Sequence, residues 1–194
     1  KDQVNLTDED SRIMPVAGGG FGQAYAAQAG VAAGSMLVLT SDVVQDTNDK
    51  KQIDPALQHL GQLPEVLGKV ETLLADSGYY SEVNEKACAA AGIAPLIAPG
   101  RERHHRSFKE RFAAAPPAPH EPTALQAMIH QLATPEGRQS YALRKQTPEP
   151  VFGIIKSVME FRQFCLRGLQ KVKGEWNLVT MTWNIKRMFA LKQA

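Results

Sequence analysis

The sequence predicts a mixed α/β fold, because strand-like and helix-like segments alternate along its first half. Two strand-like stretches, 21–31 and 36–44, are joined by a short Gly-containing link that is typical of a β-hairpin. Two short apolar runs, 70–75 and 93–98, flank a helical segment. This order of elements predicts a mixed sheet with helices packed against it, followed by a helical C-terminal section.

Caps and apolar spacing predict where the helices begin and end. Asp54 as N-cap and Pro55 at the first helical position start one helix, Ser81 caps a second before Gly92, and Thr123 caps a third. The expected helices cover 55–63, 82–91, 123–132, 135–145, 148–169 and 175–191. In the last one, two sets of apolar residues recur at helical spacing, and packing against the sheet is favoured over stacking on bases; the sets are Trp176, Val179 and Trp183, and Leu178, Ile185 and Met188.

Residues 99–122 interrupt this pattern with basic residues and a proline run. Such a composition is typical of a loop insertion with little buried structure. His104 and His105 are adjacent in this insertion, which favours solvated loop residues over metal ligands.

Composition sets broad limits on the class of protein. The chain has 194 residues, of which 43% are hydrophobic and 22% charged, values typical of a globular domain. No apolar run reaches the roughly 18 residues of a membrane span, and the polar opening KDQVNLTDEDSR is unlike a signal peptide. We therefore expect a cytoplasmic protein without a membrane partner, and the opening predicts that sequence is missing upstream. Cys88 and Cys165 are expected to be structural thiols rather than disulfide or metal partners.

The charge is unevenly distributed. Residues 1–76 hold 5 Lys/Arg and 11 Asp/Glu, whereas residues 77–194 hold 17 Lys/Arg and 9 Asp/Glu. A basic half is compatible with binding to a phosphate backbone, although many solvated helical faces have the same balance.

Asp76 is the first candidate site residue. It ends the apolar run 70–75 and precedes Ser77-Gly78, so its carboxylate is expected at the carboxyl end of a strand, where ligands bind in open α/β sheets. The competing interpretation is an Asp that only forms the turn.

Glu149 is the second candidate. It lies between Pro148 and Pro150 in the first turn of a predicted helix, a position that acidic residues also favour through the helix dipole. Lys156 follows seven residues later on the same helical face, with Gly153 between them. Tyr141 and Arg144 precede Glu149, so YALRKQTPEPVFGIIK gathers a carboxylate with groups that suit phosphate.

These motifs resemble those of one protein family, the insertion-sequence DDE transposases. The stretch from Tyr141 to Lys156 resembles their tyrosine–arginine–glutamate–lysine signature, and ADSGYYSE resembles the motif of their second aspartate. Further similar segments are LTDEDSRIM, GQAYAAQAGV, DVVQDTNDKKQIDPAL, IAPGRERHH and FRQFCLRGLQKVKGEWNLVTMTWNIKRM, so that the resemblance covers nearly all of the chain.

The resemblance implies a ribonuclease-H-like mixed sheet flanked by helices, with residues 1–194 forming part of one catalytic domain. It implies metal-dependent DNA strand cleavage and strand transfer at element ends, with Asp76 and Glu149 as catalytic residues that hold two Mg²⁺ ions. Tyr141, Arg144 and Lys156 would contact DNA. The implied partners are duplex DNA, both element terminal repeats and target, and a second copy of the chain on that DNA.

The chain departs from the family pattern at two places. The first catalytic aspartate, expected on the first strand of the fold, is absent, and Asp8, Asp10 and Asp42 are poor substitutes. Four residues rather than three separate Arg144 from Glu149. The first departure leaves an alternative function, that of a catalytically inactive transposase remnant that at most binds DNA.

Overall fold

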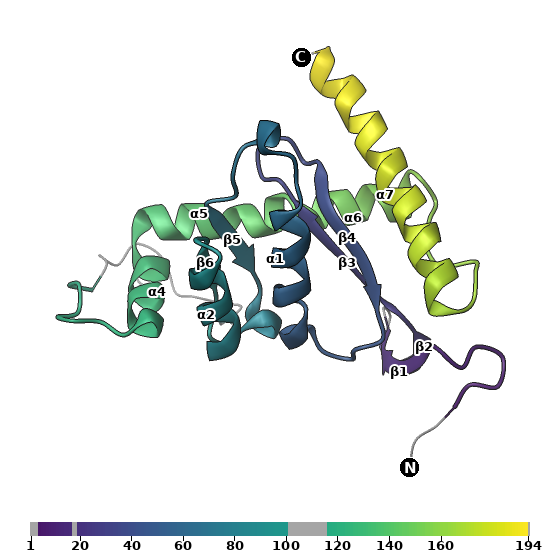
Figure 1. Cartoon of the computed structure of the whole chain (residues 1–194), viewed down its shortest axis with the longest axis horizontal. Helices are drawn as coiled ribbons and strands as arrows, with labels where there is room; N and C mark the ends of the chain where they lie inside the picture. The colour runs from purple at the N-terminus through teal and green to yellow at the C-terminus, as the bar shows by residue number, and fades with distance from the viewer. Residues whose placement is uncertain (1–3, 17–18, 101–115, 194) are drawn as a thin grey trace. The chain divides into compact units, whose positions relative to one another are not determined.

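The computed structural model describes residues 4–16, 19–100 and 116–193 (Figure 1). The described chain is a mixed α/β structure in which the strands pair into three two-stranded sheets, β1–β2, β3–β4 and β5–β6. It divides into two compact units: unit 1 holds Lys1–Asn48 and Lys145–Ala194, and unit 2 holds Asp49–Arg144. The mixed α/β class predicted from the sequence is confirmed, and the arrangement of the sheets is described for each unit in turn.

Unit 1 contains two antiparallel strand pairs. Its strands are β1 (Arg12–Pro15), β2 (Phe21–Ala24), β3 (Ala26–Val31) and β4 (Val38–Val44). The predicted hairpin is confirmed, since β3 pairs with β4 from Ala26–Val44 to Val31–Val38, with an irregularity between Gly30 and Val31. The stretch 21–31 is nevertheless two strands, and β2 pairs with β1, which the acidic and Gly-rich sequence around it did not predict.

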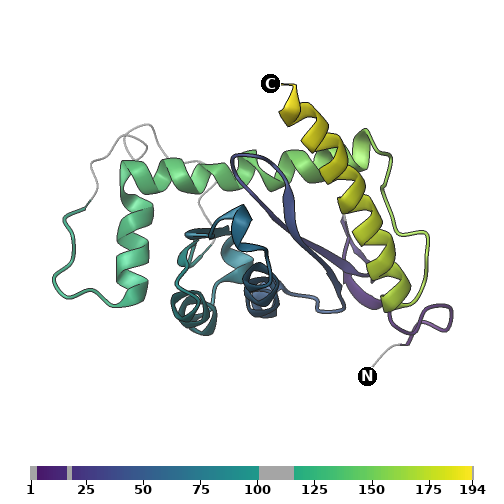
Figure 2. The ribbon, with the colours of Figure 1, turned by 45° about the horizontal axis from the view of Figure 1, so that its top comes forward.

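Two helices complete unit 1, namely α6 (Pro148–Ser157) and α7 (Leu169–Lys192). They pack on the β3–β4 hairpin through one apolar cluster, which is formed by Val38, Val43, Val151, Ile155, Val172, Trp176 and Trp183. Figures 1 and 2 show α7 running along β4. Packing was predicted for both apolar sets of this helix. It is found for Trp176 and Trp183, whereas Leu178, Ile185 and Met188 are exposed.

The predicted end of the first of these helices and the predicted start of the second are wrong, whereas the start at 148 and the end near 191 agree with the structure. The helix expected over 148–169 ends at Ser157, and the helix expected from 175 begins at Leu169. The intervening segment leaves the helical path because Phe161 and Phe164 turn inward onto Trp176, with ring centroids 6.2 and 6.5 Å away. The carboxylate of Glu175 accepts hydrogen bonds from the backbone N–H groups of Cys165 and Leu166 and thereby stabilises the non-helical path.

Unit 2 is a parallel strand pair covered by helices. Strands β5 (Thr72–Ala75) and β6 (Ala94–Ile97) pair in parallel and are joined by α2 (Glu82–Ala90), as the strand–helix–strand pattern predicted. The other elements are η1 (Asp49–Lys51), α1 (Ile53–Gly61), η2 (Glu65–Leu67), η3 (Ser77–Tyr79), α4 (Ala124–Ala133) and α5 (Pro135–Gln146), whose last two residues belong to unit 1. Helices α1 and α2 lie side by side (Figures 1 and 2).

Local sequence signals explain most helix ends in unit 2. The Ser81 side chain accepts a hydrogen bond from the Asn84 N–H, and Thr123 forms a capping box with Gln126. Gly92 has φ +70°, as expected for glycine just past a helix. Asp54 is not an N-cap, because α1 already begins at Ile53 after Gln52.

The core of unit 2 lies between β5, β6 and the helices. It is formed by Ile53, Leu57, Ala75, Cys88, Ile93, Ile97 and Met128. The predicted insertion 99–122 falls mostly on 101–115, which lie outside the described residues, and 116–122 form neither helix nor strand. Among the described helices of both units, none combines the length and apolar character that a membrane crossing requires.

Candidate active site

Asp76 follows the carboxyl end of β5, as the sequence predicted. It is the N-cap of η3, and its Oδ1 accepts a hydrogen bond of 2.8 Å from the Gly78 N–H. This bond fixes the carboxylate against the turn, while the side chain stays 51% exposed. Asp76 therefore forms the turn and also presents a carboxylate to solvent, so the two interpretations of this residue are compatible.

Two further site residues from α5 meet the end of β5. The Tyr141 hydroxyl donates a hydrogen bond of 3.2 Å to the Ala75 carbonyl, across 66 residues of sequence. The Arg144 Nη1 lies 4.0 Å from Asp76 Oδ2, and its guanidinium lies 5.2 Å from the centroid of the Tyr141 ring. Asp76, Tyr141 and Arg144 thus form one cluster within unit 2, here called the β5-end cluster.

The members of the β5-end cluster differ in exposure. Tyr141 is buried, and its hydroxyl donates a hydrogen bond to the Ala75 carbonyl. The Arg144 side chain is 19% exposed, and its Nε is buried without a hydrogen-bond partner among the described residues. An arginine held beside an aspartate at 4.0 Å, rather than in a close bidentate pair, keeps donors available for another anion.

Glu149 and Lys156 lie on α6 in unit 1. Glu149 is in the first turn of the helix, next to Pro148, and Lys156 is in its last turn, with both side chains exposed. A Cβ added to Gly153, between them, would meet no atom within 4 Å. Glu149 and Asp76 belong to different units, so the shared metal site that the resemblance implies for them stays a prediction.

The three other aspartates considered as substitutes for a first catalytic aspartate have partners within unit 1. Asp10 Oδ2 accepts a hydrogen bond of 2.9 Å from the Leu169 N–H, and Asp8 Oδ1 accepts one of 3.2 Å from the Gly168 N–H. Asp8 also accepts the Tyr25 hydroxyl at 2.7 Å, and burial followed by this bond raises the pKa of Tyr25. Asp8 and Asp10 therefore bind the start of α7.

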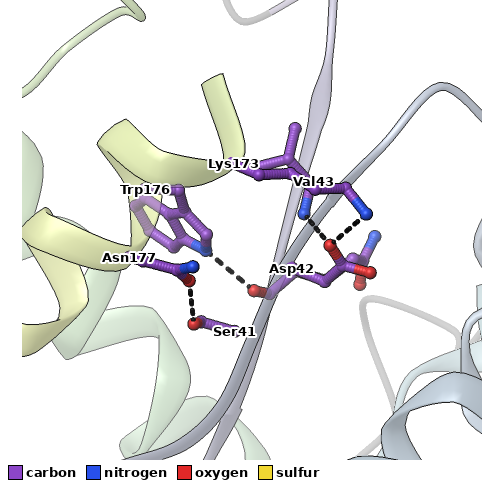
Figure 3. A network of polar contacts seen from close by, with 7 residues as sticks. Ser41, Asp42, Val43, Lys173, Trp176 and Asn177 are labelled. Carbon is purple, nitrogen blue, oxygen red and sulfur yellow. Dashed lines mark hydrogen bonds and ion pairs between the residues drawn. The ribbon is translucent and has the colours of Figure 1, made fainter. Parts of the chain in front are cut away.

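Asp42 is held by α7 (Figure 3). Its Oδ1 lies 2.9 Å from the Lys173 Nζ and also accepts the Val43 N–H, while the neighbouring Ser41 hydroxyl donates to Asn177 Oδ1 at 2.8 Å. Figure 3 shows these contacts joining β4 to one face of the helix. An aspartate that neutralises a lysine in this way is a poor ligand for a cation.

The sequence interpretation missed two residues beside Asp76, namely Asp49 and Asn84. A Cβ on Gly78 would lie 3.0 Å from Asp76 Oδ1 and 3.5 Å from Asp49 Oδ2, so both carboxylates lie beside Gly78. Asn84 is 4% exposed and donates to two backbone carbonyls near this turn. The sequence signal for Asn84 was its place three residues after the N-cap Ser81, which only indicated a helix start.

Asp76 has the chemistry of a ligand for a divalent cation such as Mg²⁺. Such ions prefer oxygen ligands and keep several waters. A half-exposed carboxylate that accepts one N–H hydrogen bond has further lone pairs for an ion. In the described ranges, however, no three His, Cys, Asp or Glu side chains come together. The described residues therefore fit one part of a metal site.

Comparisons with known proteins give one match. Residues 101–189 match the family model described as transposase DDE domain, which is slightly less than half of the chain. The matched range includes Tyr141, Arg144, Glu149 and Lys156 and leaves out Asp76. No curated protein and no solved structure gives a significant match. The C-terminal half of the chain, with the predicted signature, is thus similar to a transposase DDE domain.

Proposed function

We propose that this chain is part of a DDE transposase catalytic domain that cleaves DNA strands at insertion-element ends and joins them to target DNA. The observation that carries the proposal is the β5-end cluster, in which two residues of the predicted signature meet the predicted second aspartate. The match of residues 101–189 to a transposase DDE domain supports it independently, because that range does not include Asp76. Action on DNA would take place in the cytoplasm.

In this proposal Asp76 and Glu149 are the catalytic carboxylates. Two Mg²⁺ ions, when bound, would supply activation of the attacking oxygen and stabilisation of the leaving oxygen. The Gly78 N–H would hold the Asp76 carboxylate in place through its hydrogen bond to Oδ1. Glu149 would act from the first turn of α6, where its exposed side chain is free to approach a ligand.

The basic signature residues would hold the DNA backbone. Arg144 offers a planar guanidinium beside the Asp76 carboxylate, which suits a phosphate of the DNA backbone. Lys156, exposed on α6, would supply a second positive charge. Tyr141 is buried, its hydroxyl bonds the Ala75 carbonyl, and the Arg144 guanidinium lies over its ring. It would therefore support the guanidinium rather than contact DNA directly.

We extend the proposal to the fold and to the missing aspartate. A ribonuclease-H-like sheet has more strands than any sheet seen here, and among the described residues β3 pairs only with β4 and β5 only with β6. A strand upstream of this chain, carrying the third carboxylate, would therefore find unpaired strand edges. Asp8, Asp10 and Asp42 would not replace it, because they are engaged elsewhere.

The second candidate is a catalytically inactive remnant that at most binds DNA. The observation in its favour is that the described part of the chain holds no group of three metal-binding side chains. Two carboxylates would bind a pair of Mg²⁺ ions weakly, so the chain by itself would not cleave DNA even where its relatives do. Either candidate function is compatible with a second copy of the chain bound to the same DNA.

Cleavage of labelled element-end duplex in Mg²⁺ tests the proposal. The 194-residue chain should give no product, the chain extended upstream by the missing strand should give nicked DNA, and Glu149→Gln in the extended chain should abolish nicking while DNA binding is nearly unchanged. An extended chain that binds DNA but never cleaves it identifies the remnant. Cleavage by the 194-residue chain alone would show that one of its own acids completes the site.

DNA binding by the 194-residue chain is the companion test. Affinity for duplex should fall steeply between low and moderate salt, because bound phosphates release counterions. Arg144→Ala should weaken binding and reduce the magnitude of the salt slope by about one, the amount expected when one phosphate contact is lost. Lys86→Ala, an exposed lysine on α2 of the same unit, is the matched control. Equal losses of DNA affinity in both variants would show that Arg144 has no specific role in the proposed DNA interface.

A further inference from the structure

Asn84 joins two backbone segments beside Asp76 with one amide group. Its Nδ2 donates a hydrogen bond of 2.7 Å to the Lys50 carbonyl in η1 and one of 2.6 Å to the Tyr79 carbonyl in η3. The side chain is 4% exposed, and both of its hydrogen bonds are partly buried. In addition, the Asn84 backbone N–H is taken by the cap of α2. The residue is therefore fixed at both its backbone and its side chain.

The Tyr79 carbonyl belongs to the turn that orients Asp76. In η3 the Tyr79 N–H donates to the Asp76 carbonyl at 3.1 Å, and the Gly78 N–H donates to Asp76 Oδ1 at 2.8 Å. The peptide group that carries the Tyr79 carbonyl also carries the Tyr80 N–H, which donates to the Ser77 carbonyl at 3.4 Å. Rotation of this peptide would therefore disturb the turn that presents the Gly78 N–H to the carboxylate. The Asn84 amide opposes such a rotation, because it holds the Tyr79 carbonyl at the end of the turn.

The Lys50 carbonyl belongs to the segment that carries Asp49. Since Asp49 Oδ2 lies 3.5 Å from the place of a Gly78 Cβ, η1 and η3 come close together at this point. The Asn84 amide bonds the backbones of both segments near the point where they meet. A purely apolar residue at position 84 would fill the same space but would remove the donor that these two carbonyls share.

We propose that Asn84 is a positioning residue for the Asp76 carboxylate, acting through the Tyr79 and Lys50 carbonyls. The inference deepens the proposed function, on which its relevance to metal binding rests. The positioning itself is a property of the turn and can be measured in the 194-residue chain without DNA or an upstream strand.

Amide hydrogen exchange at Gly78 and Tyr79 measures the positioning. Asn84→Asp keeps the shape of the side chain but removes both donors, and Asn84→Ser keeps one donor if the first variant does not fold. Exchange at Gly78 and Tyr79 should accelerate about tenfold in either variant, the effect of roughly one lost net hydrogen bond. Cys88→Ala, at a fully buried residue of the same helix, is the control for a general loss of stability.

Broadening of the Gly78 amide signal by Mn²⁺ connects the turn to the metal. If Asp76 binds the ion, the dissociation constant should rise several-fold to tenfold in the Asn84 variants and stay near wild type in Cys88→Ala, as expected for a residue behind a ligand. Exchange that changes no more in the Asn84 variants than in Cys88→Ala overturns the positioning role, whatever Mn²⁺ does. Accelerated exchange in a chain whose wild type never binds Mn²⁺ at Gly78 supports the positioning role and overturns the metal role of Asp76.

Discussion

Replacement of Asp10 by alanine should destabilise unit 1 at the start of α7. The N-cap of this helix is Gly168, which has no side chain to cap it, so the first N–H groups depend on the carboxylates of Asp8 and Asp10 from 159 or more residues earlier in the chain. In Asp10→Ala the Leu169 N–H loses a charged acceptor at 2.9 Å. Loss of a capping carboxylate costs about 1–2 kcal/mol.

Thermal unfolding followed by circular dichroism measures this cost. For a chain of this size about 1–2 kcal/mol corresponds to a decrease in Tm of about 2 to 8 °C. Glu9→Ala is the matched control, since Glu9 lies between the two aspartates, is exposed and contributes only its backbone carbonyl, to Arg12. If Glu9→Ala lowers Tm as much as Asp10→Ala, the carboxylate does not cap α7 and this account of the acidic segment is wrong.

Two further predictions concern unit 2 and the cysteines. Cys165 is exposed and Cys88 is fully buried with its thiol pKa raised by burial, so iodoacetamide at neutral pH should modify Cys165 first, and peptide mass mapping of a brief reaction should show Cys88 unmodified. Gly78→Ala should displace Asp76, because the new Cβ would lie 3.0 Å from its Oδ1. The control is Gly61→Ala, whose Cβ would meet nothing within 4 Å. We expect Mn²⁺ to broaden the amide signals of this turn less in Gly78→Ala than in the control, and equal broadening would contradict the prediction.

Much of the fold could be predicted because its signals are local. The β3–β4 hairpin, the β5–α2–β6 unit and the caps at Ser81 and Thr123 depend on residues close in sequence. The break between α6 and α7 could not be predicted in this way. It depends on Phe161 and Phe164 packing onto Trp176, a contact across the break that helical periodicity does not encode.

Strand β1 was missed for a related reason. Its residues, Arg12–Pro15, are mostly exposed and end in proline, so they lack the apolar alternation of a half-buried strand. Pairing with β2 forms the strand regardless of that pattern. The acidic residues before it carry no sequence signal of their partners, because Asp8 and Asp10 bind the backbone of Gly168 and Leu169, about 160 residues later in the chain.

The candidate site shows how far residue types alone can go. Tyr141, Arg144 and Asp76 were selected separately, two from a helix and one from a strand end, and the structure brings them within one cluster. Residue types did not reveal that Tyr141 faces the Ala75 carbonyl, because hydrogen-bond direction depends on how α5 lies against β5. The same limit applies to Asn84, whose function depends on two carbonyls that no side-chain pattern specifies.

The geometry around Asp76 also separates two requirements of the proposed activity that sequence motifs merge. Orientation of the carboxylate is already supplied within unit 2, by the Gly78 N–H and by the turn that Asn84 holds. Completion of a two-ion site needs more carboxylates than the described residues gather. A chain that lacks the second requirement can still keep the first, so the order of the turn is expected to persist in a catalytically inactive protein. Loss of cleavage in the 194-residue chain would then reflect the number of carboxylates, with the position of Asp76 unchanged.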